Sequence, residues 1–220
     1  MADTTSRAGR TYANSEILAY VAQVHHPHDA GLQRAQDAPD THGMPAIQVA
    51  PAEGRLMELL LRMVGAKRVV EIGTLAGYSA LWMARALPAD GQLITLENDS
   101  KHAAVARESI EIAGYSDRVE VLEADALDRL SEIEGRGPFC AVFIDADKER
   151  YDLYGRWAAA NVRPGGLLIG DNAYLFGDLL DESSTATAMR RFHEEMARNF
   201  VSVCVPTPDG LAIGLKQEST

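Results

Sequence analysis

Two apolar runs of the sequence end in polar residues that could bind a metal ion. The run FCAVFI stops at Asp145, with Lys148 three residues later, and the run GGLLIG stops at Asp171 and Asn172. Three oxygen donors without His or Cys at the same strand ends suit a hard ion such as Mg²⁺. Lys148 could accept the proton of a hydroxyl activated there, or balance its negative charge. The pattern therefore predicts a metal site served by a catalytic lysine.

The same acids have a structural interpretation, because Asp often caps the first turn of a helix. For Asp147, which lies between Asp145 and Lys148, capping and chemistry are equally good explanations. For Asp171 and Asn172 capping is the weaker one, since no helical pattern begins directly after them.

A glycine-containing turn follows an earlier apolar run, in VVEIGTLAGYSA. The run ends at Glu71, Gly73 and Gly77 lie in the turn, and the next run, QLITLE, ends at Glu97. Glycine allows positive φ and lets the backbone approach a ligand closely. A carboxylate at the end of the second strand could accept hydrogen bonds from ribose hydroxyls. The turn therefore predicts a nucleotide-type pocket.

The spacing of the turn distinguishes between ligands. A dinucleotide fingerprint needs G-x-G-x-x-G, whereas this turn has G-x-x-x-G with Glu71 two residues ahead of it. A carboxylate would repel a pyrophosphate but suits the cationic end of S-adenosylmethionine, which this pattern favours. A tight structural turn without a ligand remains the alternative.

The segments that carry these residues alternate between the hydrophobic periodicity of strands and that of helices. Strand-like and helix-like segments follow one another from about residue 67 to 170, which indicates a doubly covered α/β sheet of parallel strands. The last segments, FVSVCVP and LAIGLK, flank a Pro-Asp-Gly turn and predict an antiparallel hairpin at the sheet edge. Ligands of open α/β sheets bind outside the carboxyl ends of the strands, so both sites are expected at one edge.

The N-terminal quarter has a different pattern. Apolar residues at helical spacing predict a helix over about 14–26, and residues 28–50 predict a loop-rich region around a short helix. A further helix begins at Pro51 and ends at Gly65. We expect one domain over 1–220, in which a polar terminus of about ten residues begins a helical cap (1–50) for substrate and dimer contacts, and 51–220 form the core.

Composition limits the classes of partner. The 220 residues carry a net charge of −11 without a dense basic cluster, which argues against nucleic acid and anionic membranes as partners. No apolar stretch suits a signal peptide or a membrane span. Cys140 and Cys204 are expected to be reduced thiols in a cytoplasmic protein. His25, His26 and His28 lack a fourth ligand at metal spacing and are assigned to the surface or a pocket rim.

Three motifs together resemble a known family. VVEIGTLAGYSALWMARALP, DADKERY and GGLLIGDN occur in the order and spacing of the cation-dependent class I O-methyltransferases, which include the caffeoyl-CoA and catechol enzymes. The resemblance extends from about Gly43 to the C-terminus. It implies a Rossmann-like, mostly parallel sheet of seven strands with an antiparallel C-terminal strand, and a homodimer.

The resemblance also implies roles for individual residues. Asp145, Asp171 and Asn172 match the ligands of Mg²⁺ or another divalent cation such as Mn²⁺ or Ca²⁺, and Lys148 matches the catalytic lysine, with Asp145 beside it. The positions that match contacts to S-adenosylmethionine are Val49, Glu71, Gly73, Thr74, Ser79, Glu97, Ala126 and Asp145.

The acceptor is less well defined by the sequence. Plant members carry a Trp shortly after the Asp-Asn pair, whereas this chain has AYLFG, so Tyr174 and Phe176 are expected to line a differently shaped acceptor pocket. Two adjacent metal-binding oxygens suit a catechol-like small molecule of secondary metabolism. A hydroxyacyl group on a carrier protein or CoA is the alternative substrate, and a non-catalytic S-adenosylmethionine-binding partner is the alternative class.

Overall fold

A seven-stranded sheet forms the centre of the computed structural model, which describes residue 4 and residues 11–217. The strand order is β3-β2-β1-β4-β5-β7-β6. Strands β1 to β5 pair in parallel, and β7 pairs antiparallel with both β5 and β6. The strands are β1 (Arg68–Ile72), β2 (Gln92–Glu97), β3 (Val119–Glu123), β4 (Phe139–Ile144), β5 (Val162–Gly170), β6 (Phe200–Val205) and β7 (Leu211–Lys216).

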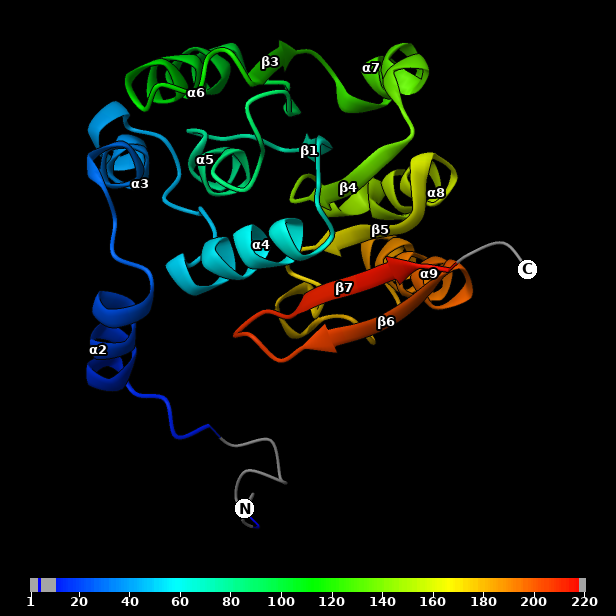
Figure 1. Cartoon of the computed structure of the whole chain (residues 1–220). Coiled ribbons are helices and arrows are strands. Elements are labelled where there is room, and N and C mark those ends of the chain that lie inside the picture. Colours follow the sequence, from blue (N-terminus) through cyan, green and yellow to red (C-terminus); the bar gives the residue numbers. More distant parts are fainter. Residues whose placement is uncertain (1–3, 5–10, 218–220) are drawn as a thin grey trace.

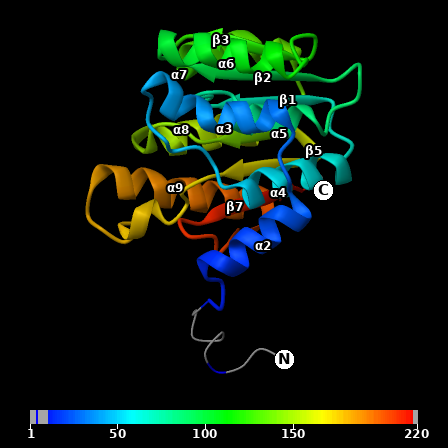
Figure 2. The same ribbon diagram turned by 90° about the vertical axis from the view of Figure 1, so that its left-hand side faces the viewer.

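Helices cover both faces of this sheet (Figure 1). One apolar core packs α3 (Ala30–His42), α4 (Pro51–Met63), α5 (Tyr78–Ala84) and α6 (Ser100–Ile112) against one face. The other packs α7 (Ala126–Ile133), α8 (Tyr151–Asn161) and α9 (Ser184–Asn199) against the opposite face. Figure 2 shows α3 and α4 in front of the strands. Neighbouring residues Val69 and Val70 belong to different cores, because side chains alternate along a strand.

The α/β architecture and the C-terminal hairpin confirm the prediction from the sequence. Apolar β4 is buried along its whole length, as a central parallel strand requires. The turn between β6 and β7 contains the predicted Pro-Asp-Gly segment and ends at Gly210, whose φ is 83°. The sheet therefore places the ends of β1, β2, β4 and β5 at one edge.

The region 28–50 is more helical than predicted. Helix α3 has thirteen residues, where the sequence predicted a short helix in a loop-rich segment. Its ends are well defined, since the Asp29 side chain accepts from the Leu32 amide and Gly43 ends the helix at φ 59°. Pro39 lies within the helix and is buried, and this proline is what weakened the helical pattern in the sequence.

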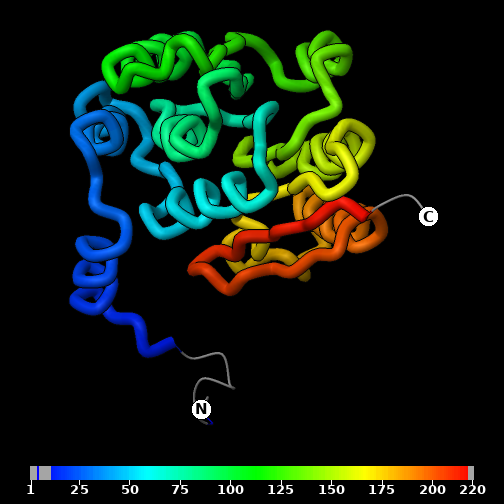
Figure 3. The backbone as a smooth tube through the Cα atoms, viewed as in Figure 1, coloured from blue at the N-terminus to red at the C-terminus, as the bar shows by residue number. Residues whose placement is uncertain are grey.

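Helix α2 (Ser15–His25) lies apart from the body of the molecule, as Figure 3 shows. Asn14 caps it through a hydrogen bond from the Ile17 amide, and none of its residues is buried. Residue 4 aside, the predicted polar terminus lies outside the described residues. Among the described residues, no helix combines the length and apolar character needed to cross a membrane.

Candidate active site

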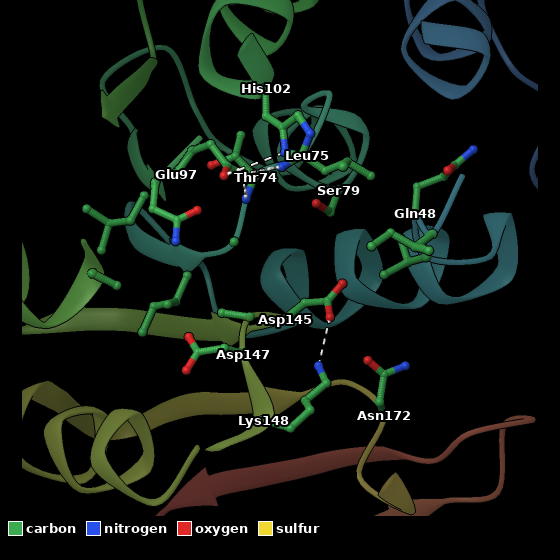
Figure 4. Close-up of a pocket in the computed structure, with 18 of the residues that line it drawn as sticks. Gln48, Thr74, Leu75, Ser79, Glu97, His102, Asp145, Asp147, Lys148 and Asn172 are labelled. Atoms are coloured by element: carbon green, nitrogen blue, oxygen red, sulfur yellow. Dashed lines mark hydrogen bonds and ion pairs between the residues drawn. The ribbon is translucent and has the colours of Figure 1, made fainter. Parts of the chain in front are cut away.

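A cavity of about 660 Å³ opens at the carboxyl ends of the parallel strands. This volume is in the range of small-molecule and cofactor sites. Figure 4 shows Glu97, Thr74 and His102 toward one end of it, and Asp145, Lys148 and Asn172 toward the other. The predicted site residues that line the cavity are Val49, Gly73, Thr74, Ser79, Glu97, Ala126, Asp145, Lys148, Asn172 and Phe176.

The turn after β1 forms one wall because glycine lets it approach β4 closely. Gly73 has φ 95°, and a Cβ added there would lie 2.0 Å from the backbone oxygen of Asp145. Gly77, at φ 85°, is the N-cap residue that precedes helix α5. Only a residue without a side chain fits between the turn and the end of β4, so this contact holds the predicted nucleotide turn against the predicted metal-binding strand.

Glu97 holds the same turn from the other side. Its Oε2 accepts hydrogen bonds from the amides of Thr74 (3.3 Å) and Leu75 (2.8 Å), and its Oε1 accepts from the Asp99 amide (3.0 Å). The side chain is nearly buried but still lines the cavity. Glu97 therefore shapes the turn and presents a carboxylate to whatever occupies the cavity.

Glu71 lies behind this wall, and it is not among the lining residues. Its carboxyl group is fully buried, and it accepts hydrogen bonds from Ser79 Oγ and Thr95 Oγ1, both at 2.5 Å. Burial raises its pKa from 4.5 to about 8, against the effect of these two hydrogen bonds, and the carboxylates of Asp145 and Glu97 act in the same direction as burial. Ser79, which does line the cavity, connects Glu71 to it.

This raised pKa predicts a pH-dependent stability. Between pH 4.5 and about 8 the folded protein holds on Glu71 a proton that the unfolded chain has released. The free energy of unfolding should therefore fall as pH rises through this window, by a few kcal/mol at about 1.4 kcal/mol per pKa unit. Glu71→Gln should remove this contribution, which urea unfolding at pH 5 and pH 8 in EDTA would measure. An unchanged pH dependence in the variant would contradict the burial effect.

Lys148 is held at the opposite end of the cavity. Its Nζ donates to Asp145 Oδ1 at 3.1 Å and to the Tyr151 hydroxyl at 3.3 Å, and it lies 4.7 Å from the centre of the Tyr151 ring. Its side chain is largely buried. The ammonium group is therefore fixed beside the carboxylate that ends β4.

Tyr151 joins the ends of β4 and β5. Its buried hydroxyl lies 2.7 Å from the backbone oxygens of both Ile144 and Asp171. Burial raises the pKa of Tyr151 well above its ordinary value, and the carboxylates of Asp145 and Asp171 add to this effect. Tyr151 therefore remains a neutral donor, and it fixes the spacing of the two strand ends that carry the acids.

Asp171 lies in a group of acids that the sequence did not fully predict. One ligand oxygen from each of Asp171, Glu53 and Asp209 lies within 4.8 Å of the others. Burial raises the pKa of Asp171 from 3.8 to about 8, and the neighbouring carboxylates of Asp145, Glu53 and Asp209 act in the same direction. Asn172 is next to this group, since its Nδ2 donates to Asp209 Oδ2 at 2.5 Å.

The donor set fits a divalent cation. Carboxylate and amide oxygens are the ligands that Mg²⁺ and Ca²⁺ prefer, and Asp145, Asp171 and Asn172 supply them at adjacent strand ends. Within residues 11–217, Asp171 and Asp209 form no ion pair with a basic side chain. Because Asn172 Nδ2 is engaged by Asp209, its Oδ1 remains for a ligand. A cation would favour the ionised form of Asp171, against the burial and the neighbouring carboxylates that raise its pKa.

Asp147 has a role that neither interpretation of the sequence predicted. Its side chain makes no capping hydrogen bond to the short 3₁₀ helix that follows it, Lys148–Arg150. It accepts instead from Arg150 Nε and the Tyr154 hydroxyl, both at 2.7 Å, while Arg150 also binds Asp125. This network joins the loop after β4 to the loop after β3, and it lies along the cavity wall.

Three predicted site residues lie outside the lining. Glu71 and Asp171 are buried directly behind it, whereas Tyr174 packs its ring against Gly210, in the turn between β6 and β7. The backbone turns at Leu175 and Phe176, both at positive φ, so that Phe176 is exposed at the cavity. Of the two residues predicted to line the acceptor pocket, Phe176 therefore lines the cavity and Tyr174 does not.

Sequence reasoning missed Gln48, His102, Glu53 and Asp209. Gln48 and His102 line the cavity from a loop and from α6, which carry no motif. One feature of the sequence could have identified Glu53. It lies four residues before Met57 and eight before Leu61, so this carboxylate is on the apolar side of the helix. Asp209 was explained by the turn in which it lies. The three N-terminal histidines were assigned to the surface or a pocket rim, and for His26 this was wrong, because it is buried. His28 bonds at 2.8 Å to the hydroxyl of Tyr78, which lines the cavity.

Comparison with known proteins identifies relatives across nearly the whole chain. A family model described as O-methyltransferase matches residues 25–217. A catechol O-methyltransferase from Niastella koreensis is 42% identical over an alignment of 213 positions that covers 91% of this chain and 93% of that one. A catechol O-methyltransferase from Mycobacterium tuberculosis is 44% identical over 161 residues, or 73% of each chain. The solved structure of an O-methyltransferase from Bacillus cereus in complex with SAH has a TM-score of 0.85 and 36% identity, covering 92% of this chain and 97% of that one.

Proposed function

Since the chain belongs to the O-methyltransferase family and is a S-adenosylmethionine-dependent enzyme, we propose that it requires a divalent cation and methylates a catechol-like small molecule. The observation that carries the proposal is the oxygen-only group around Asp171 at the end of β5, whose member Asp209 lines the cavity. Two adjacent hydroxyls of an acceptor could reach a cation held there, and two relatives are named catechol O-methyltransferases.

We assign the glycine-turn end of the cavity to the methyl donor. When bound, S-adenosylmethionine supplies an electrophilic methyl group on a sulfonium sulfur. Gly73 and Thr74 would contact its methionine part, and Glu97 would accept from the ribose hydroxyls. Val49, Ser79 and Ala126, which line the same cavity, would complete the contacts, with Glu71 acting through Ser79 and Asp145 lying next to the sulfonium.

The Asp145, Asp171 and Asn172 side chains would hold the cation. A divalent cation bound there would supply Lewis acidity that favours the ionised form of a nearby hydroxyl. Phe176 at the cavity mouth would contact the acceptor and help to exclude water. These residues orient the acceptor oxygen toward the methyl group, and much of the rate would come from this proximity.

Lys148 would accept the proton of the acceptor hydroxyl or balance the negative charge that forms on its oxygen. Transfer of the methyl group would break the S–C bond, leaving its electrons on sulfur, and form a C–O bond to the acceptor. The hydroxyl proton is lost to Lys148 when its amine is neutral, or to solvent when it is an ammonium that balances the oxyanion. Asp145 and Tyr151 keep Nζ in place for either role.

Removal of the metal tests the proposal directly. EDTA treatment followed by desalting should abolish methyl transfer to catechol, and added Mg²⁺ should restore it. The transfer is measured as SAH formed from S-adenosylmethionine with a panel of catechols and single phenols. Full activity after chelation, or equal activity toward single phenols, would count against a chelating mechanism.

We also propose that the protein is a homodimer. Helix α2 exposes Leu18, Tyr20 and Val24 without burying any residue, and β6 exposes Val201 and Val203. A second copy of the chain would cover such apolar surface, which contributes about 25 cal/mol per Å² buried. Light scattering should give twice the chain mass of 23.9 kDa, and Val201→Lys together with Val203→Lys should shift the species toward the monomer.

A further inference from the structure

Glu53 is a buried carboxylate in the first turn of α4, and it belongs to the acidic group with Asp171 and Asp209. The residue is 7% exposed to solvent. Its Oε2 accepts from the Ala50 amide at 2.9 Å, in a capping arrangement at the start of the helix. This contact accounts for one carboxylate oxygen, and it leaves the other to be explained.

The second oxygen has no hydrogen-bond partner. Oε1 of Glu53 and the hydroxyl of neighbouring Thr207 are both buried, and neither makes a hydrogen bond of good geometry among the described residues. Burial raises the pKa of Glu53, and the nearby Thr207 hydroxyl acts in the opposite direction. Glu53 also has no basic partner in the part of the chain that the structure describes. A buried carboxylate oxygen without a partner is costly, and a cation that accepts its lone pair would remove this cost.

The distances suit one shared ion. Two oxygens on opposite sides of a cation are separated by twice the metal–oxygen distance, about 4.1 Å for Mg²⁺ and about 5 Å for Ca²⁺. Ligand oxygens of Glu53, Asp171 and Asp209 lie within 4.8 Å of one another. Glu53 can therefore reach an ion bound by Asp171 from the side of α4.

We propose that Glu53 is a further ligand of the catalytic cation. The proposal rests on the metal dependence proposed above and adds a carboxylate from α4 to the strand-end set. Helix α4 directly follows the loop that carries Gln48 and Val49 along the cavity. Binding of the ion would therefore fasten this loop and helix to the sheet edge.

Glu53→Gln is the discriminating variant. Glutamine keeps a side-chain oxygen for the Ala50 amide, so the helix start is preserved, while the charge is lost. The matched control is Glu58→Gln on the same helix, a buried carboxylate that pairs with Arg55 and Arg62 instead. Titration calorimetry with MnCl₂ on the metal-free protein should show at least tenfold weaker binding for Glu53→Gln and unchanged binding for Glu58→Gln.

Two further measurements separate the role of a ligand from that of structure. Glu53→Asp keeps the charge but withdraws the oxygen by one methylene group, and it should also weaken Mn²⁺ binding. In EDTA the melting temperature of Glu53→Gln should equal or exceed that of the wild type. The increase in melting temperature on addition of Mn²⁺ should be smaller in the variant than in the wild type. SAH affinity should stay unchanged, which shows that the cavity is intact.

The outcomes distinguish this inference from the proposed function. Wild-type Mn²⁺ affinity in Glu53→Gln or in Glu53→Asp would overturn the assignment of Glu53 and leave metal dependence standing. Failure of the wild-type protein to bind Mn²⁺ would overturn both.

Discussion

Asp171→Ala is expected to lower kcat/KM for catechol methylation by about a thousandfold or more. Asp171 is buried at the centre of the oxygen cluster, and the variant should lose the cation with it. Lewis-acid stabilisation contributes several kcal/mol, and each 1.36 kcal/mol corresponds to a factor of ten in rate. Affinity for SAH should change little, because Asp171 is not among the residues that line the cavity.

Calorimetry with MnCl₂ and with SAH, together with steady-state kinetics, would check this result. Asp152→Ala is the matched control, since Asp152 is also a buried carboxylate but pairs with Arg156 on α8. The control should retain Mn²⁺ binding and activity. An Asp171→Ala protein that still turned over at the wild-type rate would remove Asp171 from the metal site.

Lys148→Met is expected to reduce kcat by a factor of about 10² to 10⁴, the range of general acid–base contributions. The side chain keeps its length and apolar stem but loses the Nζ that contacts Asp145 and Tyr151. Binding of Mn²⁺ and SAH should persist, because the oxygen ligands and the glycine turn are unchanged. The loss should therefore be in the chemical step.

Lys148→Arg separates the two roles proposed for the lysine. Arginine keeps a positive charge but does not lose its proton in proteins, so it can balance an oxyanion without serving as a base. If Lys148→Arg transfers the methyl group in a single turnover at nearly the wild-type rate, the role of Lys148 is to balance charge. If its rate is as low as that of Lys148→Met, the role of Lys148 is to accept the proton. Wild-type turnover in Lys148→Met would refute both.

The sheet and the position of its site were predictable because the signals were local. Runs such as FCAVFI are too apolar for anything but a buried strand, and parallel strands bring their carboxyl ends to one edge. The acids at 145 and 171 could therefore be assigned to one place before any geometry was known. The glycine turn was placed by the same rule, with Gly73 against the end of β4.

The residues that were missed come from segments with competing explanations. Glu53 begins a helix, where an acid is expected at the N-terminus, and Asp209 lies in a hairpin turn, where Asp is common. Each of these roles concealed the fact that the side chain faces a cluster formed by distant segments. Tyr174 and Phe176 are two residues apart, and only the positive φ at Leu175 and Phe176 decides which one faces the cavity.

The hydroxyl of Tyr151 bears on which ion would fit the proposed cation site. The hydroxyl bridges the backbone oxygens of Ile144 and Asp171, and it reinforces the hydrogen bond from the Asp171 amide to the Ile144 oxygen, so the spacing of the two acidic strand ends is set before an ion binds. A rigid site binds ions of one radius more tightly than others, whereas a flexible site would adjust to each ion. We expect Tyr151→Phe to accept small and large divalent ions more evenly, so that selectivity between Mg²⁺ and Ca²⁺ is governed by a residue that touches neither.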